Sequence, residues 1–208
     1  MSRYCKIVVL PEDWCHAHLA RGFFQGRNVD GRAYDLKQRW HGRNGNAAAV
    51  VRWLCEEARL QSKTTSGRYG ILAIVDEDGK GLEHLRNTID EALTNVGLRA
   101  TNPTDGRCLV LPMRNVETWM VWVARWKAAG GSTAPGATAE YQPVNEAHDY
   151  KRWRCQTGQP LPKESLAKPY LVGKALAALN PAAPPAGTPP ALRAALQPLG
   201  DFLHWCRL

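Results

Sequence analysis

Residues 70–79 read GILAIVDEDG, and this stretch decides the fold. Its first half is a short apolar run that begins at a glycine, which is typical of a buried strand at the centre of a parallel sheet. The run ends abruptly in Asp76, Glu77 and Asp78. In an open α/β sheet, functional groups gather at the carboxyl ends of the strands. We therefore expect an acidic site at the end of this strand.

The spacing of the two aspartates indicates what this site binds. Asp76 and Asp78 are two residues apart, so an extended backbone would point both carboxylates the same way and Glu77 the other way. Adjacent carboxylates repel one another unless a cation lies between them, and their hard oxygens suit Mg²⁺, which also binds water and phosphate oxygens. The sequence thus predicts a Mg²⁺ site, open to Mn²⁺, in which Glu77 is dispensable and Asp76 is not.

The rest of the chain alternates between strand and helix patterns. Such alternation predicts an α/β fold with a mainly parallel central sheet flanked by helices on both faces. The expected core spans residues 1–128, and residues 129–208 form a basic, Pro/Ala-rich extension whose helices pack on the core. Strands are expected at about 4–10, 33–40, 70–75 and 108–113, and helices at about 14–24, 47–60, 82–94, 118–128, 168–179 and 193–206.

Composition excludes several classes of protein. At 208 residues with 44% hydrophobic residues, the chain can bury a single core. No apolar run approaches the roughly 20 residues of a membrane span, and the amino terminus is expected to be a first strand, not a signal peptide. The six cysteines are scattered without a CxxC pair, which predicts reduced thiols in a cytoplasmic protein without a membrane partner.

The charge of the chain points to a polyanionic partner. The net charge is +8, with 17 basic against 14 acidic residues up to residue 120 and 10 against 5 beyond it. A basic surface favours nucleic acid, although the same charges are also compatible with a merely solvated surface. The candidates for phosphate contact are Arg27, Arg32, Lys37, Arg39, Arg43, Arg114, Lys151, Arg152 and Arg154.

Two further clusters have simpler explanations. Cys15, His16 and His18 do not share one face of a helix, and the other ligands of a zinc site are missing, so no zinc is expected. The tryptophans at 119, 122 and 126 recur at helical spacing, which favours packing of a helix on the sheet over stacking with nucleotides.

Carboxylates follow three of the expected strands. They are Glu12 in LPEDW, the Asp76 and Asp78 pair, and Glu117 in RNVETW. Glu12 and Glu117 also lie where an acidic residue would complement a helix dipole, so a structural role stays open for each. Read together as ligands, Asp76, Asp78 and Glu117 would hold one Mg²⁺, and Glu12 would hold a second ion or act as a general base.

This order of acids resembles the TOPRIM fold of topoisomerases, bacterial primases and OLD-type nucleases. The matching residues are Glu12 after the first strand, the Asp76-x-Asp78 pair after a later strand, and the RNVETW motif at 114–119. The motif is similar to that of small stand-alone TOPRIM-like proteins of bacterial defence loci. The resemblance covers roughly residues 4–128, but the glycine that commonly follows the first glutamate is Asp13 here, and Asp13 could substitute for Glu12.

The resemblance implies a Mg²⁺-dependent endonuclease, a hydrolase that cleaves DNA or RNA in antiviral defence together with an ABC- or SMC-type ATPase. It also implies a catalytic lysine, for which we select Lys168, with Lys163 and Lys174 as alternatives. A lysine or Arg114 would stabilise the charge that develops on the phosphate. Two other readings stay open: a degenerate adaptor that binds nucleic acid or protein without cleavage, and a nucleotidyl transferase. The sequence also leaves homo-oligomerisation open.

Overall fold

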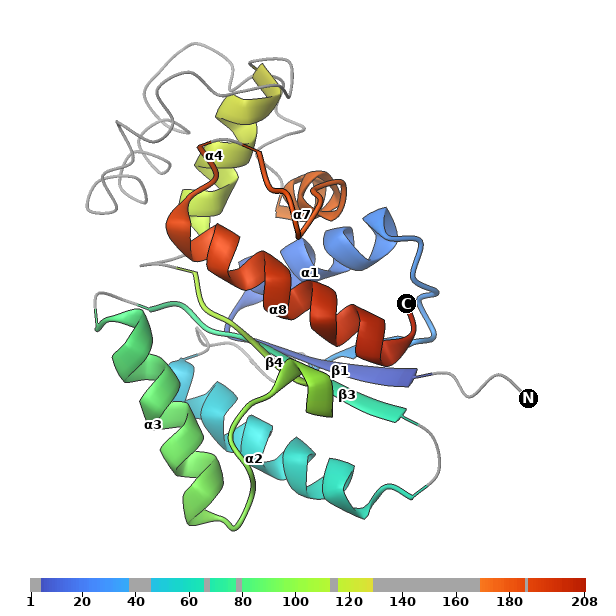
Figure 1. Cartoon of the computed structure of the whole chain (residues 1–208), viewed down its shortest axis with the longest axis vertical. Helices are drawn as coiled ribbons and strands as arrows, with labels where there is room; N and C mark the ends of the chain where they lie inside the picture. The colour runs from blue at the N-terminus through green and yellow to red at the C-terminus, as the bar shows by residue number, and fades with distance from the viewer. Residues whose placement is uncertain are drawn as a thin grey trace.

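A four-stranded parallel sheet lies at the centre of the molecule (Figure 1). Its strands follow the order β2-β1-β3-β4. Their bounds are Cys5–Pro11 for β1, Tyr34–Leu36 for β2, Arg68–Ile74 for β3 and Arg107–Val110 for β4. The structure, a computed structural model, describes residues 5–37, 46–65, 68–77, 80–112, 116–128, 169–185 and 187–208.

Helices cover both faces of this sheet, which confirms the predicted α/β class (Figure 1). Helices α1, α4, α7 and α8 share one hydrophobic cluster with one face, and α2 and α3 share a second cluster with the other face. The bounds are Trp14–Gly26 for α1, Ala47–Lys63 for α2, Leu82–Asn95 for α3, Glu117–Ala128 for α4, Pro169–Ala177 for α7 and Pro190–Cys206 for α8, with a 3₁₀ turn, η1, at Pro103–Asp105.

Strand β3 is buried on both sides, as its continuous apolar run predicts. Ile71 and Ala73 pack into the cluster of α2 and α3, whereas Leu72 and Ile74 pack into the cluster of α1. The strand pairs with β1 along its whole length and with β4 from Ile71 onward. The glycine-bounded stretch is therefore the centre of the sheet.

The predicted bounds of most elements hold to within a few residues. Asn46 caps α2 as expected, since its side-chain oxygen accepts a hydrogen bond of 2.8 Å from the amide of Ala49. Helix α8 begins at Pro190, earlier than expected, because proline at the first helical position has no N–H to leave unpaired. Strand β2 is shorter than the predicted 33–40, and residues 38–45 lie outside the described part.

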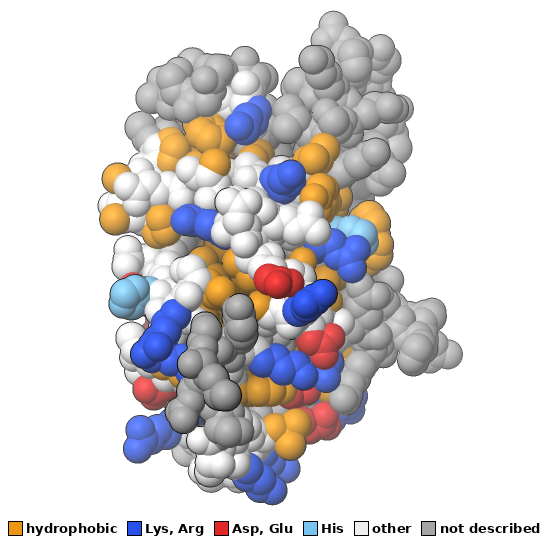
Figure 2. Space-filling model, turned by 90° about the vertical axis from the view of Figure 1, so that its right-hand side faces the viewer, with side chains coloured by type: hydrophobic (Ala, Val, Ile, Leu, Met, Phe, Trp, Pro, Cys, Tyr) orange, Lys and Arg blue, Asp and Glu red, His pale blue; other side chains and the backbone are white. Residues whose placement is uncertain are grey.

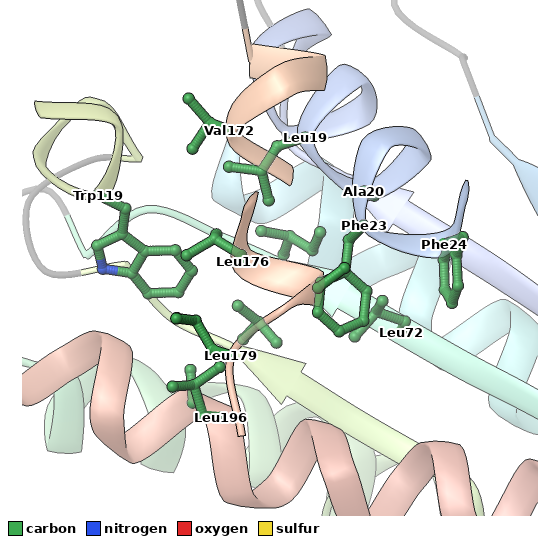
Figure 3. Packing of buried hydrophobic residues seen from close by; sticks show 14 of the residues in the cluster. Leu19, Ala20, Phe23, Phe24, Leu72, Trp119, Val172, Leu176, Leu179 and Leu196 are labelled. Atoms are coloured by element: carbon green, nitrogen blue, oxygen red, sulfur yellow. The ribbon is translucent and has the colours of Figure 1, made fainter. Parts of the chain in front are cut away.

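Helix α7 crosses α1 at very close range. A Cβ atom on Gly173 would lie 2.0 Å from the backbone oxygen of Leu19, and one on Gly22 would lie 1.8 Å from that of Tyr170. Only glycine permits this approach, which brings Leu19 and Phe23 against Val172 and Leu176 (Figure 3). The described helices of the carboxyl-terminal segment, α7 and α8, are thus part of the same core as the sheet.

The tryptophan helix packs inward. Trp119, Trp122 and Trp126 on α4 are all buried, which confirms the prediction of packing. Trp119 points toward Leu176 of α7 in Figure 3. The five cysteines of the described residues are free thiols, and three of them are buried. Within the described part of the chain, no helix is long and apolar enough to cross a membrane.

Candidate active site

The order of the strands places a change in the direction of the chain connections at the carboxyl ends of β1 and β3. From β1 the chain passes through α1 to β2 on one side, and it then returns through α2 to β3 on the other side of β1. Helices α1 and α3, which follow β1 and β3, lie on opposite faces, so the connections that leave the carboxyl ends of these two adjacent strands diverge. Open α/β sheets bind ligands at such a switch point.

Glu12 closes the end of the ladder between these two strands. Its backbone amide donates a hydrogen bond of 3.1 Å to the carbonyl of Ile74. Its carboxylate oxygen Oε2 then accepts a hydrogen bond of 2.9 Å from the backbone amide of Asp76. Glu12 is only 8% exposed. The first and second acids predicted for the site are therefore brought together by β1 and β3.

His16 joins Asp76 to helix α1. Its ring is fully buried, with Nε2 at 2.9 Å from Oδ1 of Asp76 and Nδ1 at 2.7 Å from Oδ1 of Asp13. Asp13 is the N-cap of α1 and also accepts a hydrogen bond from the backbone amide of His16. The imidazole thus bridges two carboxylates from positions 63 residues apart in the sequence.

The two carboxylates determine the charge of the imidazole. Burial alone would lower the pKa of His16, but its hydrogen bonds to Asp13 and Asp76 outweigh burial and raise the pKa to about 10. The pKa of Asp13 is lowered: burial acts to raise it, and the bonds to His16 overcome that effect. His16 is therefore an imidazolium at neutral pH, and it balances one charge of the three neighbouring carboxylates, Glu12, Asp13 and Asp76.

Glu77 points to the other face of the sheet. Its backbone amide continues the ladder to the carbonyl of Pro112 at 3.0 Å, and its side chain is buried and accepts a hydrogen bond from the amide of Gly81, just before α3. Asp76, in contrast, contacts α1 on the opposite face. The alternation predicted for these two neighbours is confirmed. Asp78, the second aspartate of the pair, lies outside the described residues.

Strand β4 ends at the same edge of the sheet as β3. It lies beside β3, and the chain leaves its carboxyl end toward Glu117, the first residue of α4. The backbone of Glu117 is described, but its side chain is not. Arg114 and Lys168 lie outside the described residues, as do Lys163, Arg39, Arg43, Lys151, Arg152 and Arg154.

The basic candidates within the described part do not form one patch. Arg27 donates a hydrogen bond of 3.0 Å to the carbonyl of Leu179, beyond α7, and so serves packing. Lys37 pairs with Asp35 at 3.3 Å and with Glu57 at 3.7 Å. Arg32 is exposed. Figure 2 shows the right-hand side of the view in Figure 1, and the Lys and Arg side chains there are scattered among acidic ones.

The carboxylate oxygens of Glu12 and Asp76 are suitable ligands for a hard cation such as Mg²⁺. Mg²⁺ takes one or two carboxylates and completes its shell with water and phosphate oxygens. A metal ion bound by Asp76 would share this carboxylate with His16. The described residues contain no group of three or more His, Cys, Asp or Glu side chains with a metal-binding arrangement, and the side chains of the predicted ligands Asp78 and Glu117 are not among those described.

A comparison of the chain with protein-family models, curated proteins and solved structures found no significant match. The resemblance to TOPRIM nucleases therefore rests on the quoted residues alone.

Sequence reasoning missed His16 as a site residue. Two signals mark it in retrospect. It lies three residues after the N-cap Asp13, where a side chain can reach back to the cap. It also shares the apolar face of α1 with Leu19, Ala20 and Phe23, where a polar ring needs a buried partner.

Proposed function

We propose that this chain is a Mg²⁺-dependent phosphodiester hydrolase that cleaves nucleic acid, with Glu12 and Asp76 as the described part of its metal site. The observation that carries the proposal is the hydrogen bond between the Glu12 carboxylate and the Asp76 amide, which fixes both acids at the switch point between β1 and β3. The net charge of +8 supports a polyanionic substrate.

The predicted site residues and His16 each have a definite task in this proposal. A bound Mg²⁺ would supply charge neutralisation at the phosphate and a water of lowered pKa. Glu12 and Asp76 hold the cation, and Asp78 and Glu117 complete its ligands. His16 holds the Asp76 carboxylate in one orientation through Nε2, and Asp13 holds the imidazole. Lys168 or Arg114 would stabilise the developing charge, and an ABC- or SMC-type ATPase in a defence system would regulate the activity.

Cleavage assays with neighbouring isosteric variants test this proposal. Plasmid, single-stranded DNA and tRNA are incubated with Mg²⁺ or Mn²⁺, and Asp76→Asn is compared with Glu77→Gln. We expect Asp76→Asn to reduce cleavage by about 100-fold or more, because it removes a ligand charge but keeps an oxygen that can accept from His16. Glu77→Gln should stay within about threefold, since its side chain faces α3. Cleavage that survives Asp76→Asn unchanged refutes the assignment.

One observation favours a second candidate, a non-cleaving adaptor of the same fold. Glu12 caps the end of β3 and Asp76 anchors His16, so each acid has a structural role without any metal. Titration calorimetry with Mn²⁺ separates the two candidates. A hydrolase should bind Mn²⁺ and lose this binding in Asp76→Asn, whereas an adaptor should show no binding that depends on the acids. A nucleotidyl transferase would instead require a nucleoside triphosphate.

A further inference from the structure

The exposed face of α1 carries an aromatic and basic stripe that starts at the proposed site. Its members are Trp14, His18, Arg21 and Gln25, spaced by four, three and four residues, so they lie on one side of the helix. The opposite side of α1 is buried in the core. Trp14 is the first residue of the helix and follows Glu12 by only two positions. The stripe therefore begins beside the acids of the switch point.

Trp14 is unusually exposed for its size. It is 57% exposed, more than any other large hydrophobic residue of the described part of the chain. Its ring lies against that of His18, with centroids 4.3 Å apart and planes tilted by 43°. Burial and the nearby Arg21 lower the pKa of His18, so this ring is neutral at pH 7. The pair thus presents an aromatic, uncharged platform to solvent next to an acidic site.

The far end of the stripe leads into a hollow. Arg21 and Gln25 line a pocket of about 470 Å³ together with Tyr34 and Asp35 of the edge strand β2. Arg21 is exposed and, among the ion pairs of the described residues, it takes part in none. Arg21 follows Trp14 by seven residues, so its guanidinium lies about two helical turns, roughly 10 Å, along α1 from the indole. A phosphate can therefore reach Arg21 while a base of the same strand stacks on Trp14.

We propose that the Trp14–His18–Arg21 stripe binds a single-stranded segment of nucleic acid, with a base stacked on Trp14 and a phosphate at Arg21. That the bound polymer is a nucleic acid rests on the proposed function. The stripe adds that this nucleic acid is single-stranded. A base can stack on an indole only when it has left its own helical stack, so the stripe selects single strands over duplex. The strand then runs from Arg21 past Trp14 to Glu12 and Asp76.

Binding is tested without cleavage. Fluorescence anisotropy of labelled single-stranded and duplex oligonucleotides of one sequence is measured in EDTA, which removes divalent cations. We expect the wild type to prefer the single strand, and Trp14→Ala to weaken single-strand binding about tenfold while duplex binding changes less than twofold. Trp14→Phe keeps a stacking ring and should lose about threefold or less. A plot of the logarithm of the binding constant against the logarithm of the salt concentration has a negative slope, and Arg21→Gln should make this slope less steep by about one.

Leu60→Ala is the matched control, because Leu60 is 53% exposed on α2, across the sheet from the stripe. It should leave both affinities unchanged. Equal single-strand affinity in Trp14→Ala and the wild type overturns the proposal, as does an equal loss in Leu60→Ala. An α1 surface that binds a protein partner would give the first of these results. This assay measures binding without metal, whereas the hydrolase proposal is tested by comparing cleavage by Asp76→Asn with that by the wild type. A negative result in one assay therefore leaves the other proposal standing.

Discussion

The Nε2 atom of His16 lies 2.9 Å from Oδ1 of Asp76, and this bond ties helix α1 to the end of the central strand. The imidazole is completely buried and Asp76 is only 13% exposed. The bond therefore links the architecture of the sheet to the geometry of the proposed site, and its removal should affect both stability and metal binding.

Replacing His16 should destabilise the fold strongly. His16→Ala leaves the carboxylates of Asp13 and Asp76 without their cationic partner, and breaking a buried charged pair costs several kcal/mol. Since Asp13 is partly exposed, we expect a loss of about 3 kcal/mol in the free energy of unfolding. Urea denaturation measures this loss. His204→Ala, an exposed histidine on α8, should change stability by less than about 0.5 kcal/mol. Similar values for both variants would show that the bridge is unimportant.

Stability should fall as the solution becomes alkaline. The pKa of His16 is about 10 in the folded chain against an ordinary value of 6.5, so the folded state holds a proton that the unfolded state has lost between these values. The stabilisation is complete below pH 6.5 and disappears as the pH rises through 10, at up to about 1.4 kcal/mol per pH unit.

The difference between the wild type and His16→Gln isolates this effect, because buried thiols such as Cys108 also destabilise the fold at high pH. Urea midpoints are compared from pH 6 to pH 10. The two proteins should converge in stability with rising pH, and a constant difference over this range contradicts a charged imidazole.

The sequence predicted the parts of the fold that depend on local patterns. The apolar run before Asp76 identified the central strand, and the helical spacing after Asn46 identified α2 with its cap. The meeting of Glu12 and Asp76 followed from the rule that parallel strands end at the same edge. These inferences hold because each needs only the periodicity of one segment or the common direction of parallel strands.

Contacts between distant segments could not be predicted in this way. His16 and Asp76 are 60 residues apart, and nothing in either segment specifies the other as a partner. The same is true of Gly22 and Gly173, whose lack of a side chain matters only because α7 crosses α1. The ion pair of Lys37 could not be predicted either, since Lys37 follows strand β2 and its partner Glu57 lies on helix α2.

The crossing of α1 and α7 should not tolerate a methyl group. In Gly173→Ala the new Cβ would lie 2.0 Å from the backbone oxygen of Leu19, and a backbone atom cannot move aside as a flexible side chain can. We expect a loss of about 3 kcal/mol or more, measured by thermal or urea unfolding. Gly31→Ala is the control, because a Cβ there meets nothing within 4 Å. Equal stability of the two variants would mean that the helices are farther apart than described.

Glu12→Gln should separate the structural role of this residue from its proposed role in metal binding. The amide oxygen of glutamine can still accept the hydrogen bond from the Asp76 amide, so the free energy of unfolding should change by less than about 1 kcal/mol. The negative charge is lost, and we expect the Kd for Mn²⁺ to rise about tenfold or more in titration calorimetry. Glu57→Gln is the matched control, because Glu57 is also buried but bonds to Tyr69 away from the switch point. If Glu12→Gln binds Mn²⁺ as the wild type does, Glu12 only caps β3, and the metal site must be built from Asp76 and its neighbours alone.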